Sequence, residues 1–250
     1  KPDQYLLAVN LVNWTRIVGQ ICYYFYAYNR LANHENLNFS IPTGNFGNVF
    51  ACYPAFKMGL PSKTISVAVN DNDILHRFFA SNDYSKKQVH ETISPSMDIS
   101  VASNFERLVY DFFLDRSTAK CAELFNSFPS RGIELDEATW DKKNTLFSSS
   151  SVDDAATQAI IQSVNNEHHY LLDPHTAVAM QEAIEASSNT DHYVVLATAH
   201  PAKFPDIYKK LAIDLSETPK ALKGLYDKTE HLHHFDANYD EITSFINSRN

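Results

Sequence analysis

LNFSIPTGNFGNVFACYPAFKMGLPSKTISVAV, residues 37–69, is the stretch of sequence that decides the fold class. Its first and last segments, Leu37–Pro42 and Thr64–Val69, are apolar runs rich in β-branched and aromatic residues, which are typical of strands. Between them, Val49–Met58 is predicted to be a helix that ends at Gly59. A strand, a helix and a strand of these lengths predict a right-handed βαβ unit in a parallel sheet.

Helical spacing of apolar residues continues over most of the remaining chain. A third strand is predicted at His192–Thr198, and the sequence therefore predicts an α/β fold with at least three parallel strands. Residues 103–190 are expected to form a largely helical insert within a domain at 1–212, and residues 213–250 a helical tail. The predicted helices are Asn10–Leu31, Asp71–Phe79, Asn104–Leu114, Thr118–Phe128, Val152–Asn166, His175–Ala186 and Pro205–Ala212.

Composition and charge argue against several classes of protein. The chain has 250 residues, of which 44% are hydrophobic, so it can bury a sizeable core. Its net charge of −9 argues against nucleic-acid binding, because that affinity depends on basic contacts with phosphates. No apolar run is long enough to span a membrane, and no signal peptide is visible. Three widely spaced cysteines, an odd number, favour a reduced cytoplasmic protein over a disulfide framework.

The loop Pro42-Thr-Gly-Asn-Phe-Gly-Asn48 is the segment that points most clearly to chemistry. It contains Gly44 and Gly47, two of only six glycines in the chain. Glycines permit positive φ angles and let backbone N–H groups converge on an anion, and the start of the following helix adds free amides. The loop contains no Lys or Arg and matches neither nucleotide-binding glycine pattern. From spacing alone, a small-phosphate site and an ordinary tight turn are equally good interpretations.

Seven ordered motifs, this loop included, resemble those of threonine synthases, which are pyridoxal-phosphate enzymes of the tryptophan-synthase-β-like fold (fold type II). The resemblance runs from about residue 5 to about residue 210, and it implies a three-layer open parallel sheet with helices on both faces. The other six motifs are Asn10-Leu-Val-Asn-Trp-Thr-Arg-Ile17, Val69-Asn-Asp-Asn-Asp-Ile74, Ser96-Met-Asp-Ile99, Ser103-Asn-Phe-Glu-Arg-Leu108, Leu172-Asp-Pro-His-Thr-Ala177 and Ala197-Thr-Ala-His-Pro-Ala-Lys-Phe204.

The resemblance implies roles for individual residues of this chain. Thr198 would hydrogen-bond the ring nitrogen of pyridoxal 5′-phosphate, where a neutral hydroxyl limits how strongly the ring withdraws electrons. Thr198 also ends a predicted strand, and active sites of open α/β sheets lie at such ends. Asn13 and Arg16 would hold the phosphate and carboxylate of the substrate. The residues that would bind the cofactor phosphate are Gly44, Asn45, Phe46, Gly47 and Asn48.

Other interpretations of these and further polar residues stay open. Arg16 lies on a mostly apolar helix, where a structural ion pair explains a guanidinium as well as a ligand contact does. His175 follows a helix-start signal, so capping or packing is its commoner role. The cluster His231-x-His-His234 lacks the spacing of standard metal sites, so a solvated polar stretch is favoured and no metal is predicted.

The lysine that forms a Schiff base with the cofactor is absent from the matched segments. In threonine synthases it lies in an N-terminal domain, within a Phe-Lys-Asp-like motif, whereas Phe56-Lys57 of this chain is followed by Met58. The resemblance therefore implies no catalytic residue here and a truncated, C-terminal portion that is inactive by itself. The implied partner is the lysine-bearing N-terminal domain of the same protein.

The parent enzyme implied by the resemblance is a lyase of threonine biosynthesis. It would convert O-phospho-L-homoserine and water into L-threonine and phosphate by γ-elimination and β-addition. Two alternatives remain. A threonine-synthase-like phospholyase would stop after the elimination and release a keto acid, and a non-catalytic fragment would have a binding or signalling role of its own.

Overall fold

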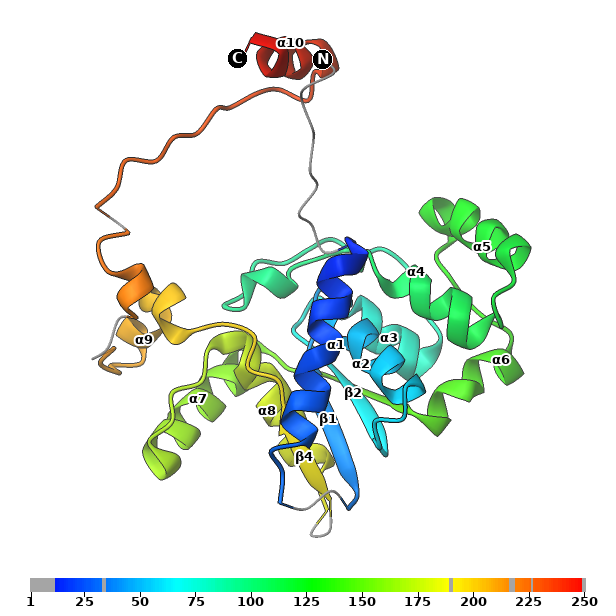
Figure 1. The fold of residues 1–250 in the computed structure, drawn as a ribbon, viewed down its shortest axis with the longest axis horizontal. Coiled ribbons are helices and arrows are strands. Elements are labelled where there is room, and N and C mark those ends of the chain that lie inside the picture. The colour runs from blue at the N-terminus through cyan, green and yellow to red at the C-terminus, as the bar shows by residue number, and fades with distance from the viewer. Residues whose placement is uncertain (1–11, 33–34, 189–190, 216–218, 226, 249–250) are drawn as a thin grey trace. The chain divides into compact units, whose positions relative to one another are not determined.

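The computed structural model describes residues 12–32, 35–188, 191–215, 219–225 and 227–248 (Figure 1). The described residues divide into two units, one that ends at Leu215 and one that begins at residue 219. The first unit contains the whole sheet and the buried hydrophobic core, which extends no further along the described chain than Tyr208.

Four parallel strands form one sheet in the order β3-β2-β1-β4. They are β1 (Leu37–Pro42), β2 (Thr64–Val69), β3 (Phe147–Ser151) and β4 (His192–Val195). β1 pairs with β2 from Asn38↔Thr64 to Pro42↔Ala68, and with β4 on its other side. The prediction of an α/β fold with at least three parallel strands is confirmed, and β1 and β2 form at their predicted ranges. The strand predicted at His192–Thr198 is shorter than predicted, because β4 ends at Val195 and Thr198 follows it.

β3 is the strand that the sequence does not predict, because residues 103–190 read as largely helical. Its sequence, Phe147-Ser-Ser-Ser-Ser151, is mostly serine, which is not among the residues enriched in strands. The strand forms because β2 pairs with it over five residues, from Ile65↔Phe147 onward. The hydroxyls of Ser66 and Ser148 also lie 2.7 Å apart across this pair. Tertiary pairing therefore overrides local preference at this edge of the sheet.

Helices cover both faces of the sheet, as a three-layer architecture requires. Phe39 of β1 packs edge-on against Tyr24 of α1, and Phe147 packs against α2 and α3 on the same face. Ser40, the next residue along β1, points to the opposite face and donates to the Ala179 carbonyl of α8 at 2.8 Å. The helices of the first unit are α1 (Trp14–Tyr28), α2 (Gly47–Lys57), α3 (Ile74–Ser81), α4 (Phe105–Leu108), α5 (Thr118–Arg131), α6 (Glu137–Asp141), α7 (Asp154–His168), α8 (Pro174–Ala186) and α9 (Pro205–Lys210).

Several predicted helices differ from the observed ones. Helix α3 begins at Ile74 rather than Asp71, and the carboxylate of Asp73 makes no capping bond because it accepts from Arg77 at 2.9 Å. The helix predicted at Asn104–Leu114 forms as α4 and then widens into a π-type turn over Val109–Phe113. Helix α1 (Trp14–Tyr28) is shorter at both ends than the predicted Asn10–Leu31, and α6 (Glu137–Asp141) is not predicted at all. The remaining helices of this unit begin and end within three residues of their predicted limits.

The tail is mostly not helical, so the prediction of a helical segment over residues 213–250 is wrong for most of its length. Its described residues form one α-helix, α10 (Tyr239–Ser248), and a short 3-10 turn at Lys220–Leu222. Leu232, in the non-helical stretch before α10, is 65% exposed, so this stretch gains little packing to offset the entropy of helix formation. In the described part of the chain no helix is long and apolar enough to cross a membrane.

Candidate functional site

The loop between β1 and α2 is held in one shape by close backbone packing. Thr43 donates its N–H to the Ala68 carbonyl at 2.8 Å, which fixes the loop beside the end of β2. A Cβ atom on Gly44 would lie 2.5 Å from the carbonyl oxygen of Ser96, so only glycine fits there. The predicted reason for the loop glycines, a positive φ, is wrong, because the loop residue with a positive φ, 64°, is Phe46.

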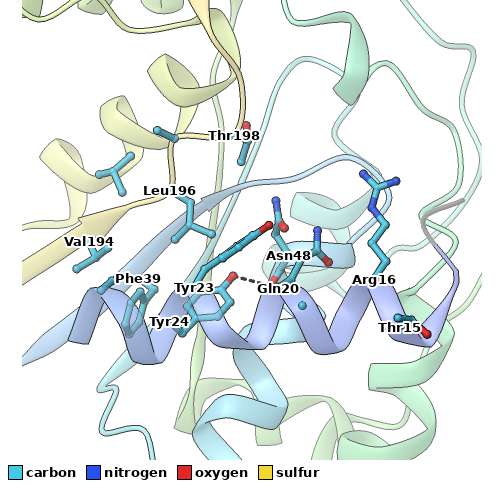
Figure 2. Close-up of a pocket in the computed structure, with 14 residues that line it drawn as sticks. Thr15, Arg16, Gln20, Tyr23, Tyr24, Phe39, Asn48, Val194, Leu196 and Thr198 are labelled. Atoms are coloured by element: carbon cyan, nitrogen blue, oxygen red, sulfur yellow. Dashed lines mark hydrogen bonds between the residues drawn. The ribbon is translucent and has the colours of Figure 1, made fainter. Parts of the chain in front are cut away.

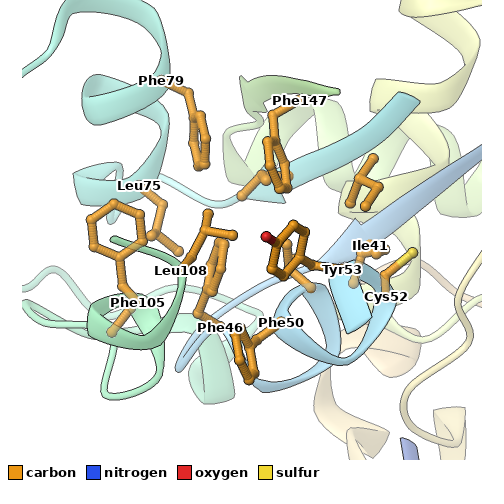
Figure 3. Packing of buried hydrophobic residues seen from close by; sticks show 14 of the residues in the cluster. Ile41, Phe46, Phe50, Cys52, Tyr53, Leu75, Phe79, Phe105, Leu108 and Phe147 are labelled. Atoms are coloured by element: carbon orange, nitrogen blue, oxygen red, sulfur yellow. The ribbon is translucent and has the colours of Figure 1, made fainter. Parts of the chain in front are cut away.

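Phe46 anchors this loop to the hydrophobic core (Figure 3). Its side chain is 1% exposed, and its ring packs edge-on against Phe105 with centroids 5.4 Å apart. A left-handed backbone is unusual for a residue other than glycine, and the buried ring holds it in place. Phe46 can therefore contact a ligand in the pocket only through its backbone.

The backbone N–H groups of residues 44–48 are available to a ligand. Gly47 and Asn48 open helix α2, whose first N–H groups have no acceptor within the helix. No carbonyl or side chain of the described residues accepts a hydrogen bond from the N–H groups of this loop. Because the helix dipole adds partial positive charge at the same point, the loop is suited to a small anion.

A pocket of about 370 Å³ opens beside the loop and joins residues that are far apart in the sequence. It is lined by residues 44–48, by Arg16 of α1, and by Thr198, which follows β4. The structure therefore brings together the predicted phosphate loop, the predicted ring-nitrogen residue and one predicted substrate residue. The pocket lies at the carboxyl ends of β1 and β4, where sites of open α/β sheets are found.

The two predicted substrate residues have different surroundings. Asn13 does not line the pocket, and its side chain accepts from the Thr15 N–H at 2.9 Å, so it caps α1. Arg16 lines the pocket and is exposed rather than buried. No carboxylate of the described residues lies within ion-pair distance of its guanidinium, which removes the support for a structural ion pair.

A larger cavity of about 730 Å³ adjoins this pocket between α1 and β4 (Figure 2). Arg16, Gln20, Asn48 and Thr198 line both cavities. The hydroxyl of Tyr24 donates to the Asn48 carbonyl at 2.6 Å, and burial raises the pKa of Tyr24, so the hydroxyl remains a donor. Further walls of the cavity are apolar and come from Phe39, Val194 and Leu196. A ligand held by the loop therefore has room to extend into an apolar groove.

Further polar residues line the pocket without a ligand-binding role predicted from the sequence, among them Gln20, Ser96, His175 and Lys203. Ser96, His175 and Lys203 belong to motifs that carry the resemblance, so motif position is a signal for them. Gln20 stands four residues after Arg16, which places both on one face of α1. Its Oε1 atom is buried and has no hydrogen-bond partner among the described residues, as expected of a polar atom that meets a ligand.

The two histidines near the pocket have structural partners. Helix α8 is capped by Asp173, and the buried His175 instead reaches from the helix start to Ser96, whose N–H donates to Nε2 at 3.2 Å. His200 accepts from the Ala202 N–H at 3.1 Å and caps a short turn. No group of three or more His, Cys, Asp or Glu side chains that could hold a metal occurs within the described ranges.

A family model described as "Threonine synthase, C-terminal" matches residues 176–246. The match continues beyond residue 210, so the tail belongs to the matched region, contrary to the limit set by the sequence motifs. The threonine synthase of Pseudomonas aeruginosa is 44% identical over 229 residues, which are 90% of this chain and 49% of that protein.

Solved structures agree with these matches. The pyridoxal-phosphate-bound threonine synthase from Brucella melitensis has a TM-score of 0.88 and 38% identity, over 97% of this chain and 53% of its own. The threonine synthase from yeast has a TM-score of 0.83 and 32% identity, over 98% of this chain and 54% of its own. The chain spans about half the length of these relatives. By sequence and by fold, it belongs to the threonine synthase family.

Proposed function

We propose that this chain is the cofactor-holding part of a threonine synthase, a lyase that converts O-phospho-L-homoserine and water into L-threonine and phosphate. The observation that carries the proposal is that residues 44–48, Arg16 and Thr198 all line one pocket. Family membership supports the activity. The pyridoxal-phosphate-bound relative from Brucella melitensis supports pyridoxal 5′-phosphate as the cofactor.

The pocket fits the two polar ends of pyridoxal 5′-phosphate. The N–H groups of residues 44–48 donate to no acceptor in the described chain and can bind the phosphate group. Thr198 offers a hydroxyl to the ring nitrogen from the same pocket. When bound, the cofactor supplies an electron sink for the substrate, and the neutral hydroxyl of Thr198 moderates it, because it does not hold a positive charge on the ring.

We propose Arg16 as the residue that binds an anionic group of the substrate. Its guanidinium presents two parallel N–H donors, which match a carboxylate or a phosphate. Its exposed position in the lining of both cavities supports this role, as does the lack of a carboxylate partner in the described residues. Because Asn13 caps α1, we propose that it acts on the substrate by fixing the helix turn that carries Arg16.

The reaction also needs a lysine beside the cofactor, and we propose that the N-terminal domain of the same protein supplies it. Lys57 lies outside the pocket, over the Tyr53 ring at 5.8 Å. The half of the relatives' length that this chain does not span supports a lysine from elsewhere in the protein. We further propose residues 1–212 as the cofactor-binding domain and 213–250 as a separate tail.

We propose a cytoplasmic location and no nucleic-acid partner. The three free cysteines, two of them buried, support a reducing compartment. The net charge of −9 supports the lack of a nucleic-acid partner, because phosphate backbones repel an acidic surface.

The test compares this chain by itself with the protein that joins it to the proposed lysine-bearing domain. Both are supplied with pyridoxal 5′-phosphate and O-phospho-L-homoserine, and phosphate, amino-acid products and the Schiff-base absorption band are measured. We expect phosphate and threonine from the joined protein, and neither turnover nor an absorption band from the chain alone. 2-Oxobutyrate in place of threonine would identify a phospholyase. Turnover by the chain alone would mean that a lysine of this chain, such as Lys203 in the pocket, does the work assigned to the other domain, and an inactive joined protein would contradict the proposal.

A further inference from the structure

We infer that Asp173 is a positioning residue that fixes both ends of the proposed cofactor site through two neighbouring side chains. One arm runs from Asp173 through His175 to Ser96, beside the phosphate loop. The other arm runs from Asp173 through Thr176 to Thr198, at the ring-nitrogen end. The identity of the ligand rests on the proposed function, whereas the contacts are properties of this structure.

Asp173 is a buried carboxylate that accepts hydrogen bonds on both oxygens. It is 2% exposed, and its Oδ1 atom accepts from the His175 N–H at 3.0 Å and lies 3.1 Å from His175 Nδ1. Its Oδ2 atom accepts from the Thr176 hydroxyl. Burial acts to raise the pKa of Asp173, but the hydrogen bonds from His175 and Thr176 outweigh burial and hold the pKa below its ordinary value. Asp173 is therefore ionised at neutral pH and orients both neighbours.

The first arm ends at the wall of the phosphate loop. Because Nε2 of His175 accepts the Ser96 N–H at 3.2 Å, the ring proton is on Nδ1, which donates to Asp173. The carbonyl oxygen of Ser96 packs so closely on Gly44 that it leaves no room for a Cβ atom there. The orientation of the His175 ring therefore sets where Ser96 stands against the loop.

The second arm ends at the residue proposed to meet the ring nitrogen. The Thr176 hydroxyl donates its hydrogen bond to Asp173, so its oxygen is free to accept a second one. That oxygen accepts from the Thr198 N–H at 3.3 Å. Thr198 lies beyond the last residue of β4, Val195, so strand pairing does not fix its backbone. A hydroxyl that donates on one side and accepts on the other makes this link, and valine cannot make it.

Binding experiments on the full chain separate the two arms. The probes are inorganic phosphate and pyridoxamine 5′-phosphate, which needs no lysine, and calorimetry gives the affinities. We expect His175→Phe to weaken phosphate binding about threefold to tenfold, the loss of about one hydrogen bond. Thr176→Val should leave the affinity for phosphate unchanged and weaken the affinity for pyridoxamine 5′-phosphate by a similar factor. Thr176→Ser, which keeps the hydroxyl, should have the unaltered chain's affinity for pyridoxamine 5′-phosphate. Asp173→Asn should weaken the binding of both probes.

Amide hydrogen exchange gives a second readout that needs no ligand. The Ser96 N–H should exchange faster in His175→Phe, and the Thr198 N–H faster in Thr176→Val, while amides of β1 and β2 report that the fold is intact. The matched control is Thr157→Val, because Thr157 is also a buried threonine near a helix start but lies outside the pocket. This control should change neither amide.

The outcomes distinguish this inference from the proposed function. Unchanged exchange at Ser96 and Thr198 in the two single-arm variants would overturn the positioning role, whatever the chain binds. Faster exchange in a chain that binds no pyridoxamine 5′-phosphate would support the positioning role and overturn the proposed cofactor. Should Asp173→Asn fail to fold, the single-arm variants still decide the question.

Discussion

Gly44 and Gly19 are two glycines at which an added methyl group has opposite expected effects. At Gly44 a Cβ atom meets the Ser96 carbonyl at 2.5 Å, so Gly44→Ala must displace backbone, and we expect a loss of about 1–3 kcal/mol in the free energy of unfolding. Phosphate affinity should fall with it. At Gly19, within α1, nothing lies within 4 Å, so Gly19→Ala should gain about 0.5–1 kcal/mol. Urea unfolding and phosphate titration measure both, and equal effects would contradict the close approach at Gly44.

The sequence predicted which residues share a pocket where short ordered motifs carry those residues. The loop residues, Arg16 and Thr198 meet in one pocket as the ordered motifs imply. His175 and Ser96 are 79 residues apart, and only the folded chain brings the imidazole to that N–H. Gly44 was identified correctly but for the wrong reason, because steric closeness to another segment cannot be read from local sequence.

At the scale of elements, helix α8 packs against the sheet and carries a buried glutamate. Glu182 is 3% exposed, and its Oε2 atom has no hydrogen-bond partner among the described residues. Burial raises the pKa of Glu182, and the hydroxyls of Ser40 and Ser66 lower it without reversing the shift. Their effect is limited because Ser40 donates to the Ala179 carbonyl of the helix. Glu182 therefore binds its proton more tightly in the folded chain than in the unfolded chain.

This shift predicts a pH-dependent gain from Glu182→Gln. Above the ordinary carboxyl pKa the unfolded chain releases the proton first, so rising pH destabilises the folded state relative to the unfolded one. We expect Glu182→Gln to increase the free energy of unfolding by about 1–2 kcal/mol near pH 7, and the gain to vanish below about pH 4. Glu123→Gln, at an exposed position of α5, should have no such profile. A gain that is independent of pH would contradict the raised pKa.

Helices and strands with a clear hydrophobic period were predictable from the sequence. Elements whose conformation depends on pairing or packing with another segment were not. β1 and β2 carry their own strand signal and form where the sequence predicts them. β3 becomes a strand because β2 pairs with it, although its residues are mostly serine. The tail fails in the opposite direction, since its helical pattern lacks a packing surface that would stabilise it.

At the scale of the whole molecule, the core of the first unit is complete before the tail begins. Buried hydrophobic residues of the described chain end at Tyr208, whose hydroxyl donates to the Leu172 carbonyl at 2.8 Å. We therefore expect a chain that stops after Leu215 to have a free energy of unfolding within about 0.5 kcal/mol of that of the 250-residue chain. Tyr208→Ala should lose about 3–5 kcal/mol, because it empties a fully buried site. Thermal and urea unfolding measure both, and a large loss on truncation would show that the tail completes the core.

The sheet ends differently on its two sides. β3 presents serines, whose polar side chains discourage another strand from adding. β4 ends the other side with Tyr193, Val194 and Val195, all half-buried, and no described strand pairs with its outer edge. Unpaired backbone groups beside apolar side chains are a template for edge-to-edge aggregation. We therefore expect the solubility of this chain, produced by itself, to depend on what covers the outer edge of β4.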